Sequence, residues 1–147
     1  MTGPYRKTEY CLRDNARGAA IVEFGILAPL IIAMMLGVFQ IGITMHSYNA
    51  LRSLAGDTTR YATVEYQKDR HLTDDQITQW AQARAVDGTY VLDGNDLVVT
   101  TQTPANQRVS GAQERTLTLS YKLPGLLTFF GVDGFTITYS RSIFVPA

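Results

Sequence analysis

Thiol and imidazole groups are scarce in this sequence. Its 147 residues include one cysteine and two histidines. The cysteine, Cys11, precedes the apolar run that begins after residue 18, so the rest of the chain has no disulfide and no thiol chemistry. A His/Cys zinc cluster is excluded there, since such a site takes four of these ligands. A lipid-modified Cys11 is also excluded because no apolar region precedes it.

Motifs for catalysis and nucleotide binding are also missing. No nucleophile-elbow motif and no Gly-rich phosphate loop after a strand is present, although composition alone leaves a Ser/His/Asp triad open. The turn sequence Asp93-Gly94-Asn95-Asp96 lacks the ligand spacing and the distal Glu of a calcium loop. No basic stripe with interleaved aromatic residues indicates nucleic acid. We therefore expect neither an enzyme nor a cofactor, metal or nucleic-acid site.

Charge is missing from one long stretch. Between residues 19 and 51 the only formally charged residue is Glu23, and from Phe24 to Ile43 the only strongly polar one is Gln40. As a helix rising about 1.5 Å per residue, these twenty residues span about 30 Å, the thickness of a bilayer's hydrocarbon core. A buried helix of a soluble domain would show a polar stripe, which is absent. The run predicts a single transmembrane helix.

The charges before this run predict its orientation. Residues 1–18 hold four basic and two acidic residues, and the positive-inside rule places that end in the cytoplasm. We therefore expect a cytoplasmic leader at 1–18, a transmembrane helix at 19–45 and an exported domain at 46–147. The basic residues are Arg6, Lys7, Arg13 and Arg17, and the acidic ones are Glu9 and Asp14.

The start of the run has the pattern of a precursor junction. Cleavage after Gly18 would make Ala19 the new N-terminus, with Glu23 fifth and Phe24 sixth in the mature chain. This arrangement is typical of type IV pilin-like precursors. A secretory signal peptide, cut after a shorter apolar core near Gly37 or Gly42, remains an alternative.

These residues resemble the TadE family of pseudopilins from bacterial Tad (Flp) pilus systems. The resemblance rests on RGAAIVEF at 17–24, on APL at 28–30 and on Arg-Tyr-Ala at 60–62, within residues 17–66. It implies cleavage by a prepilin peptidase at the inner membrane and a role in assembling an adhesive pilus. The implied partners are other pilin or pseudopilin subunits and the Tad assembly platform. Phe24 replaces the Tyr of the Flp pattern, and the length favours a TadE- or TadF-like member.

The polar and small residues of the run have candidate roles in packing. Glu23 can pair with the amine that cleavage creates at Ala19, on its own or a neighbouring helix, or it can reach water near the head groups. Pro29 predicts a local loosening of the helix. Ala33 and Gly37 form a small-xxx-small pair for a partner helix. Gln40 can bond across helices or to backbone.

The exported part predicts an α+β, pilin-like fold with a small antiparallel sheet of three to four strands. Apolar spacing continues the first helix over 46–66, as the spine of the domain. Thr73 and Gln76 form a capping box for a second helix at 74–86, with Trp80 expected in the core. Alternating residues predict strands near 89–92, 97–103, 115–123 and 135–145, with a polar loop at 104–114.

One apolar segment lies between the last two predicted strands. It contains Leu126, Leu127, Phe129 and Phe130. It can cover one end of the sheet, or it can contact another pilus subunit or the membrane interface.

Two classes of function remain. The first is a cleaved structural pseudopilin. The second is an uncleaved, signal-anchored module whose exported domain binds another component of the cell envelope.

Overall fold

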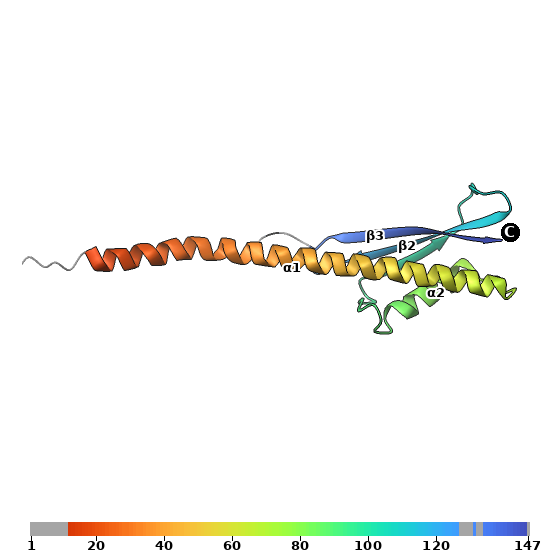
Figure 1. Cartoon of the computed structure of the whole chain (residues 1–147), viewed down its shortest axis with the longest axis horizontal. Helices are drawn as coiled ribbons and strands as arrows, with labels where there is room; N and C mark the ends of the chain where they lie inside the picture. Colours follow the sequence, from red (N-terminus) through yellow and green to blue (C-terminus); the bar gives the residue numbers. More distant parts are fainter. Residues whose placement is uncertain (1–11, 127–130, 132–133, 147) are drawn as a thin grey trace, which may run out of the picture.

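The computed structural model describes residues 12–126, 131 and 134–146. Two helices are followed by three strands, in an α+β arrangement (Figure 1). The elements are α1 (Leu12–Gln67), α2 (Asp74–Ala85), β1 (Leu97–Gln102), β2 (Ala112–Lys122) and β3 (Thr136–Pro146).

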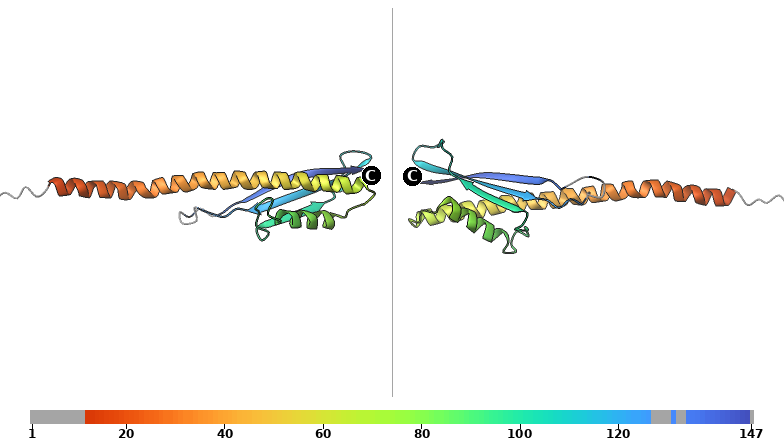
Figure 2. Two further views of the ribbon diagram at one scale, coloured as in Figure 1. Left: turned by 60° about the horizontal axis from the view of Figure 1, so that its bottom comes forward. Right: turned by 180° about the vertical axis from the view of Figure 1, so that it is seen from behind.

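The molecule is elongated because α1 extends far beyond the other elements. The sheet and α2 lie along the C-terminal half of α1, and the N-terminal half projects away from them (Figures 1 and 2). The predicted α+β class, with a long first helix, a short second helix and a small antiparallel sheet, is confirmed.

Helix α1 is continuous over 56 residues and passes through Pro29 without ending. It begins at Leu12, inside the segment predicted as leader. Its C-terminal half buries one face, because small and apolar residues recur there every three or four positions. The buried residues of this face are Ser47, Ala50, Leu51, Leu54, Ala55, Thr58, Ala62 and Glu65.

The sheet is antiparallel with the order β1-β2-β3. Val99 pairs with Leu119, and Leu119 pairs with Tyr139, so these side chains share the face that packs on the helices. The predicted alternation along β2 is confirmed, since Leu117, Leu119 and Tyr121 are buried. The core lies between this face and the C-terminal half of α1, with α2 beside β1.

Helix α2 starts as predicted. The Thr73 hydroxyl accepts a hydrogen bond from the Gln76 amide and the Gln76 side chain accepts one from the Thr73 amide, which completes the capping box. Ile77 and Ala81 are buried. The placement of Trp80 in the core is wrong: its half-buried ring stacks on Tyr61 of α1 at the edge of the α1–α2 contact, with 4.4 Å between ring centroids.

The predicted strand at 89–92 is also wrong. Tyr90 and Leu92 do point into the core, but Val91 between them has φ of +55° and is 75% exposed, which interrupts the extended backbone. The Tyr90 hydroxyl donates a hydrogen bond to the Asp57 carboxylate on α1. Burial, followed by this hydrogen bond, raises the pKa of Tyr90 to about 12. The segment is therefore tied to α1 by side chains rather than to the sheet by its backbone.

Strand β2 begins three residues earlier than predicted, at Ala112. Gly111, with φ of +82°, ends the preceding loop, and Gln113 then pairs with Val145 in the sheet. Glu114 is buried beneath the loop: Arg108 Nε lies 2.9 and 2.8 Å from its two carboxylate oxygens. These hydrogen bonds from Arg108 lower the pKa of Glu114 from 4.5 to about 2.

The low pKa of Glu114 predicts a specific acid sensitivity. Its ionised form is favoured in the folded chain, so its contribution to stability is complete above about pH 4.5 and is lost as the pH falls toward 2. Glu114→Gln should be less stable than the wild type at neutral pH, with the difference shrinking toward pH 2. Thermal unfolding of the full chain in detergent micelles across this range measures it. A constant difference at every pH would contradict the assignment.

Candidate functional site

The predicted precursor junction lies on the projecting half of α1. Gly18, Ala19, Glu23 and Phe24 are all helical and exposed, and Phe24 is 70% exposed. Ala19 and Glu23 are four residues apart, so they lie on the same side of the helix. Among the residues whose side chains the structure describes, none forms an ion pair with Glu23.

The glycines of this half do not pack against other described parts of the chain. A Cβ atom added at Gly18, Gly25, Gly37 or Gly42 would meet no atom within 4 Å outside its own helical backbone. The backbone at these positions is therefore open to approach from another molecule. Ala33 and Gly37, the predicted packing pair, are half-buried, and the described residues include no second candidate transmembrane helix, so their role stays a prediction.

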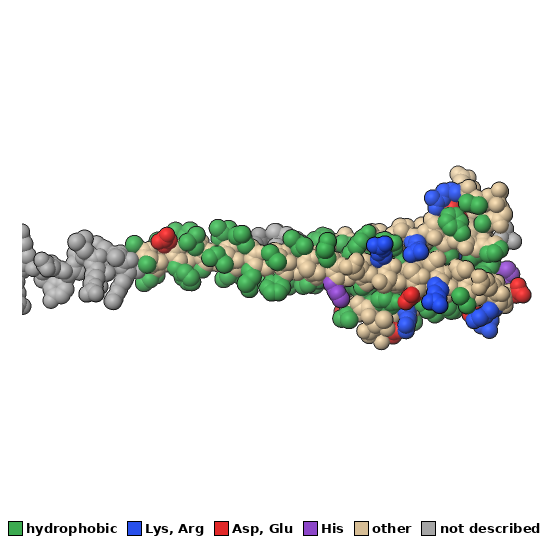
Figure 3. Space-filling view, viewed as in Figure 1, with side chains coloured by type: hydrophobic (Ala, Val, Ile, Leu, Met, Phe, Trp, Pro, Cys, Tyr) green, Lys and Arg blue, Asp and Glu red, His purple; other side chains and the backbone are tan. Residues whose placement is uncertain are grey.

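The projecting half has the surface of a membrane segment. Within the described residues, the stretch Gly18–Gln67 is the one helix whose length and apolar composition would allow it to cross a bilayer. Hydrophobic side chains surround its N-terminal part, whereas Lys and Arg side chains gather over the domain (Figure 3). The exposed apolar residues include Ile21, Ile26, Leu30, Met34, Val38, Phe39, Ile41 and Met45.

Comparison with known families gives a match within α1. Residues 18–60 match the family model of TadE-like proteins. The predicted resemblance to TadE is confirmed over these residues, which we call the TadE-like segment. The match begins at Gly18 and ends within α1, so α2 and the sheet lie outside it. No curated protein and no solved structure matches the chain.

Within the TadE-like segment, Gln40 is in contact with the connection between β2 and β3. Its Nε2 donates to the carbonyl of Pro124 at 3.1 Å, and its Oε1 accepts from the amide of Leu126 at 2.9 Å. The structure thus brings together Gln40, predicted for helix packing, and Leu126, predicted for a subunit contact. Leu127, Phe129 and Phe130, the other residues of that predicted contact, lie outside the described residues.

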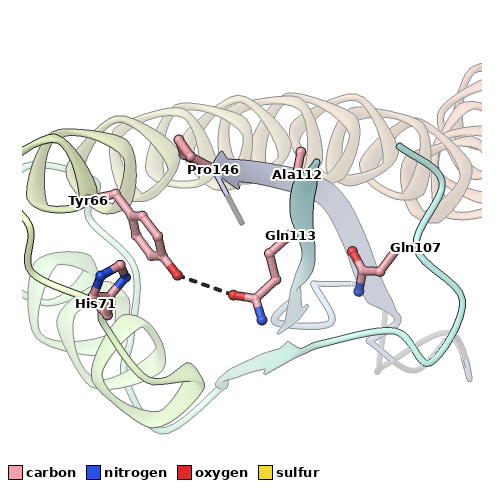
Figure 4. A pocket seen from close by; sticks show the side chains of 6 residues that line it. All are labelled: Tyr66, His71, Gln107, Ala112, Gln113 and Pro146. Atoms are coloured by element: carbon pink, nitrogen blue, oxygen red, sulfur yellow. Dashed lines mark hydrogen bonds between the residues drawn. The ribbon is translucent and has the colours of Figure 1, made fainter. Parts of the chain in front are cut away.

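The far end of the domain holds a cavity of about 340 Å³ between α1, the 103–111 loop and the ends of β2 and β3 (Figure 4). Tyr66 donates a hydrogen bond to Gln113 at 3.2 Å, and His71 meets the Tyr66 ring edge-on. The single imidazole has no carboxylate or serine beside it in this lining, so the cavity has no acid–base pair for catalysis. The lining residues are Tyr66, His71, Gln107, Ala112, Gln113 and Pro146.

A second, open groove of about 500 Å³ runs between α1 and α2, where Tyr61 stacks on Trp80. Sequence patterns missed this pair, because the two rings come from different helices. The only sequence signal that pointed to either ring was the Arg-Tyr-Ala motif at 60–62, which supports the TadE resemblance and contains Tyr61. The groove carries charges of both signs, among them Arg60 and Glu65. In the described part of the chain, no three His, Cys, Asp or Glu side chains gather as a metal site would require.

Two glycines, one without neighbours and one tightly packed, give a matched test of the packing described here. Gly25→Ala should leave the unfolding temperature of the full chain in micelles unchanged or slightly higher, because alanine favours a helix by about 1 kcal/mol over glycine. Gly134→Ala should lower it, since the new Cβ would lie 2.2 Å from the carbonyl oxygen of Leu123. Thermal unfolding followed by circular dichroism measures both. Equal stability of Gly134→Ala and wild type would show that the β2–β3 connection is not packed as described.

Proposed function

We propose that the chain is a TadE-like pseudopilin, cut by a prepilin peptidase between Gly18 and Ala19, which takes part in assembling an adhesive Tad (Flp) pilus. The observation that carries this proposal is the match to TadE-like proteins, which starts at Gly18. The exposed Gly18 supports it, because no described residue outside its own helical backbone lies within 4 Å of a Cβ added at that position.

The proposed topology follows from charge and hydropathy. The leader lies in the cytoplasm, α1 crosses the inner membrane, and the domain from residue 46 lies in the periplasm or outside the cell. In this position the partners are the peptidase, other pilin or pseudopilin subunits and the assembly platform. The TadE-like family is a structural component of the pilus, and we propose the same kind of role for this chain.

In the proposed mature subunit Glu23 is the residue that selects neighbours. An ionised carboxylate in a bilayer is costly unless it is paired. Cleavage would place a free amine at Ala19, one helical turn away on the same side. When helices pack side by side with a stagger, the amine of one subunit can meet the carboxylate of the next. Charge pairing would then set the spacing of subunits.

A second function class is favoured by a different observation. Helix α1 continues without a break from Leu12 through Gly18 and Ala19, so the junction must unwind before it can enter a peptidase. A chain that stays uncut would be a signal-anchored binding module. Such a module would present its exported domain to another envelope component.

Cleavage in cells separates the two classes. When the chain is coexpressed with an active prepilin peptidase, the purified membrane protein should begin at Ala19, as read by N-terminal sequencing and intact mass. Gly18→Asp should keep the full precursor mass, because a charged side chain replaces the hydrogen at the cut site. Gly25→Ala, a change in the same helix away from the junction, should be cut like the wild type.

The opposite result would favour the anchor. If the wild-type chain keeps its leader while the same cells process another prepilin, the pseudopilin proposal fails.

A further inference from the structure

The described residues of the connection between β2 and β3 contact the apolar part of α1. Its described residues, Leu123–Leu126 and Gly134–Phe135, lie beyond the ends of the two strands (Figure 1), and Pro124 and Leu126 bond to Gln40 on α1. Gln40 lies three residues before Ile43, the last residue of the apolar run. At about 1.5 Å per residue, this places the contact about 4.5 Å inside the end of that apolar run, within the predicted transmembrane helix at 19–45. We call these described residues the connecting loop.

The polar groups at this contact satisfy one another. The Gln40 amide uses both its donor and its acceptor on the backbone of the connecting loop. The bonded groups are the carbonyl of Pro124, a residue with no amide hydrogen of its own, and the amide of Leu126. Irregular backbone is tolerated at membrane depth only when its polar groups have protein partners. A glutamine in a membrane helix likewise needs hydrogen-bond partners. Here the Gln40 side chain and the backbone of the connecting loop provide them for one another.

The base of the loop is closed by backbone contacts. The Leu123 amide donates to the Phe135 carbonyl at 3.0 Å. Gly134 packs so tightly on Leu123 that no side chain fits there. The loop is therefore held at two points, by its own base and by Gln40.

The side chains around the loop suit a lipid boundary. Phe135 is 47% exposed at the base, and Leu126 is half-buried beside α1. Tyr48, 43% exposed, meets Tyr139 edge-on at 5.8 Å, about 7.5 Å beyond Ile43 along the helix. Exposed aromatic rings at this height are typical of the membrane–water interface. Lys122, exposed where the loop leaves β2, can reach lipid phosphates.

We propose that the connecting loop is a second membrane contact of this protein, inserted at the acyl–head-group boundary of the outer leaflet and held there by Gln40. The proposal rests on α1 crossing the bilayer, as in the proposed function. Two contacts, α1 and the loop, prevent the exported domain from turning freely about the helix. The domain then presents a fixed side to any partner in the same membrane.

Depth-dependent fluorescence quenching tests this contact. The chain has one tryptophan, so Trp80→Phe gives a dark background. The full chain is inserted in phosphatidylcholine–phosphatidylglycerol vesicles whose acyl chains carry bromine, a contact quencher. Leu126→Trp reports on the loop, Phe39→Trp on the span, and Val109→Trp on the 103–111 loop at the far end of the domain, where Val109 is 48% exposed. Phe135→Trp replaces Leu126→Trp if the latter fails to fold.

Tryptophan at 126 should lose most of its emission in brominated vesicles, as at 39, whereas tryptophan at 109 should keep it. Gln40→Leu should move the quenching at 126 toward the level at 109 and leave that at 39 unchanged, because both bonds to the loop are lost. Gln67→Leu, the same change at the exposed end of α1, is the matched control and should alter neither.

Any other outcome contradicts a specific part of the proposal. Quenching at 39 without quenching at 126 removes the loop contact and leaves the span intact. If emission at 126 is unquenched but depends on protein density in the vesicle, the loop contacts another subunit instead of lipid. Equal quenching at 126 in Gln40→Leu removes the role of Gln40. Absence of quenching at 39 removes the span, and with it both this inference and the proposed function.

Discussion

One helix has to face two different surroundings, and the change between them near Ser47 positions the rest of the chain. Before it, α1 exposes apolar side chains such as Phe39 and Met45; after it, Leu51 and Leu54 are fully buried. A helix offers only one stripe to a protein core. The sheet must therefore lie lengthwise along α1, and α2 fills the remaining side of β1. The domain lies along the helix rather than at its tip because the buried stripe runs lengthwise.

The polar contacts of the domain differ between its two ends. At the far end, ion pairs with one buried member are used: Glu65 pairs with Lys68 and Arg70, and Arg115 pairs with Asp74 at 3.2 Å. Beside the projecting half of α1 the corresponding contact is made by the neutral amide of Gln40. Ionised groups become more costly to bury as water recedes, whereas an amide satisfied by backbone remains tolerable. The use of ion pairs at one end of the domain and of a neutral amide at the other thus follows the surroundings expected at each end under the proposed function.

Features that depend on local periodicity could be predicted from the sequence. The apolar run, the capping box at Thr73 and the alternation along β2 each involve residues a few positions apart. The contacts that were missed are distant in sequence: Gln40 and Leu126 are 86 residues apart. Trp80 has the spacing of a core residue, but it lies at the edge of the buried face of α2, where its ring stacks on the ring of Tyr61. At Val91 a backbone turn replaced the extended conformation that its β-branched side chain favours.

The distribution of glycine separates a self-sufficient part of the chain from one that depends on other molecules. Gly134 is explained inside the chain, because any Cβ there would strike Leu123. Gly18, Gly25, Gly37 and Gly42 have no such contact, yet each weakens the helix by about 1 kcal/mol relative to alanine. Glu23, an exposed carboxylate on an apolar helix, raises the same question. None of the described residues packs on these glycines or pairs with Glu23. Under the proposed function, these positions serve contacts that the TadE-like segment makes outside the chain. A peptidase at Gly18 and neighbouring helices along the other glycines would supply those contacts.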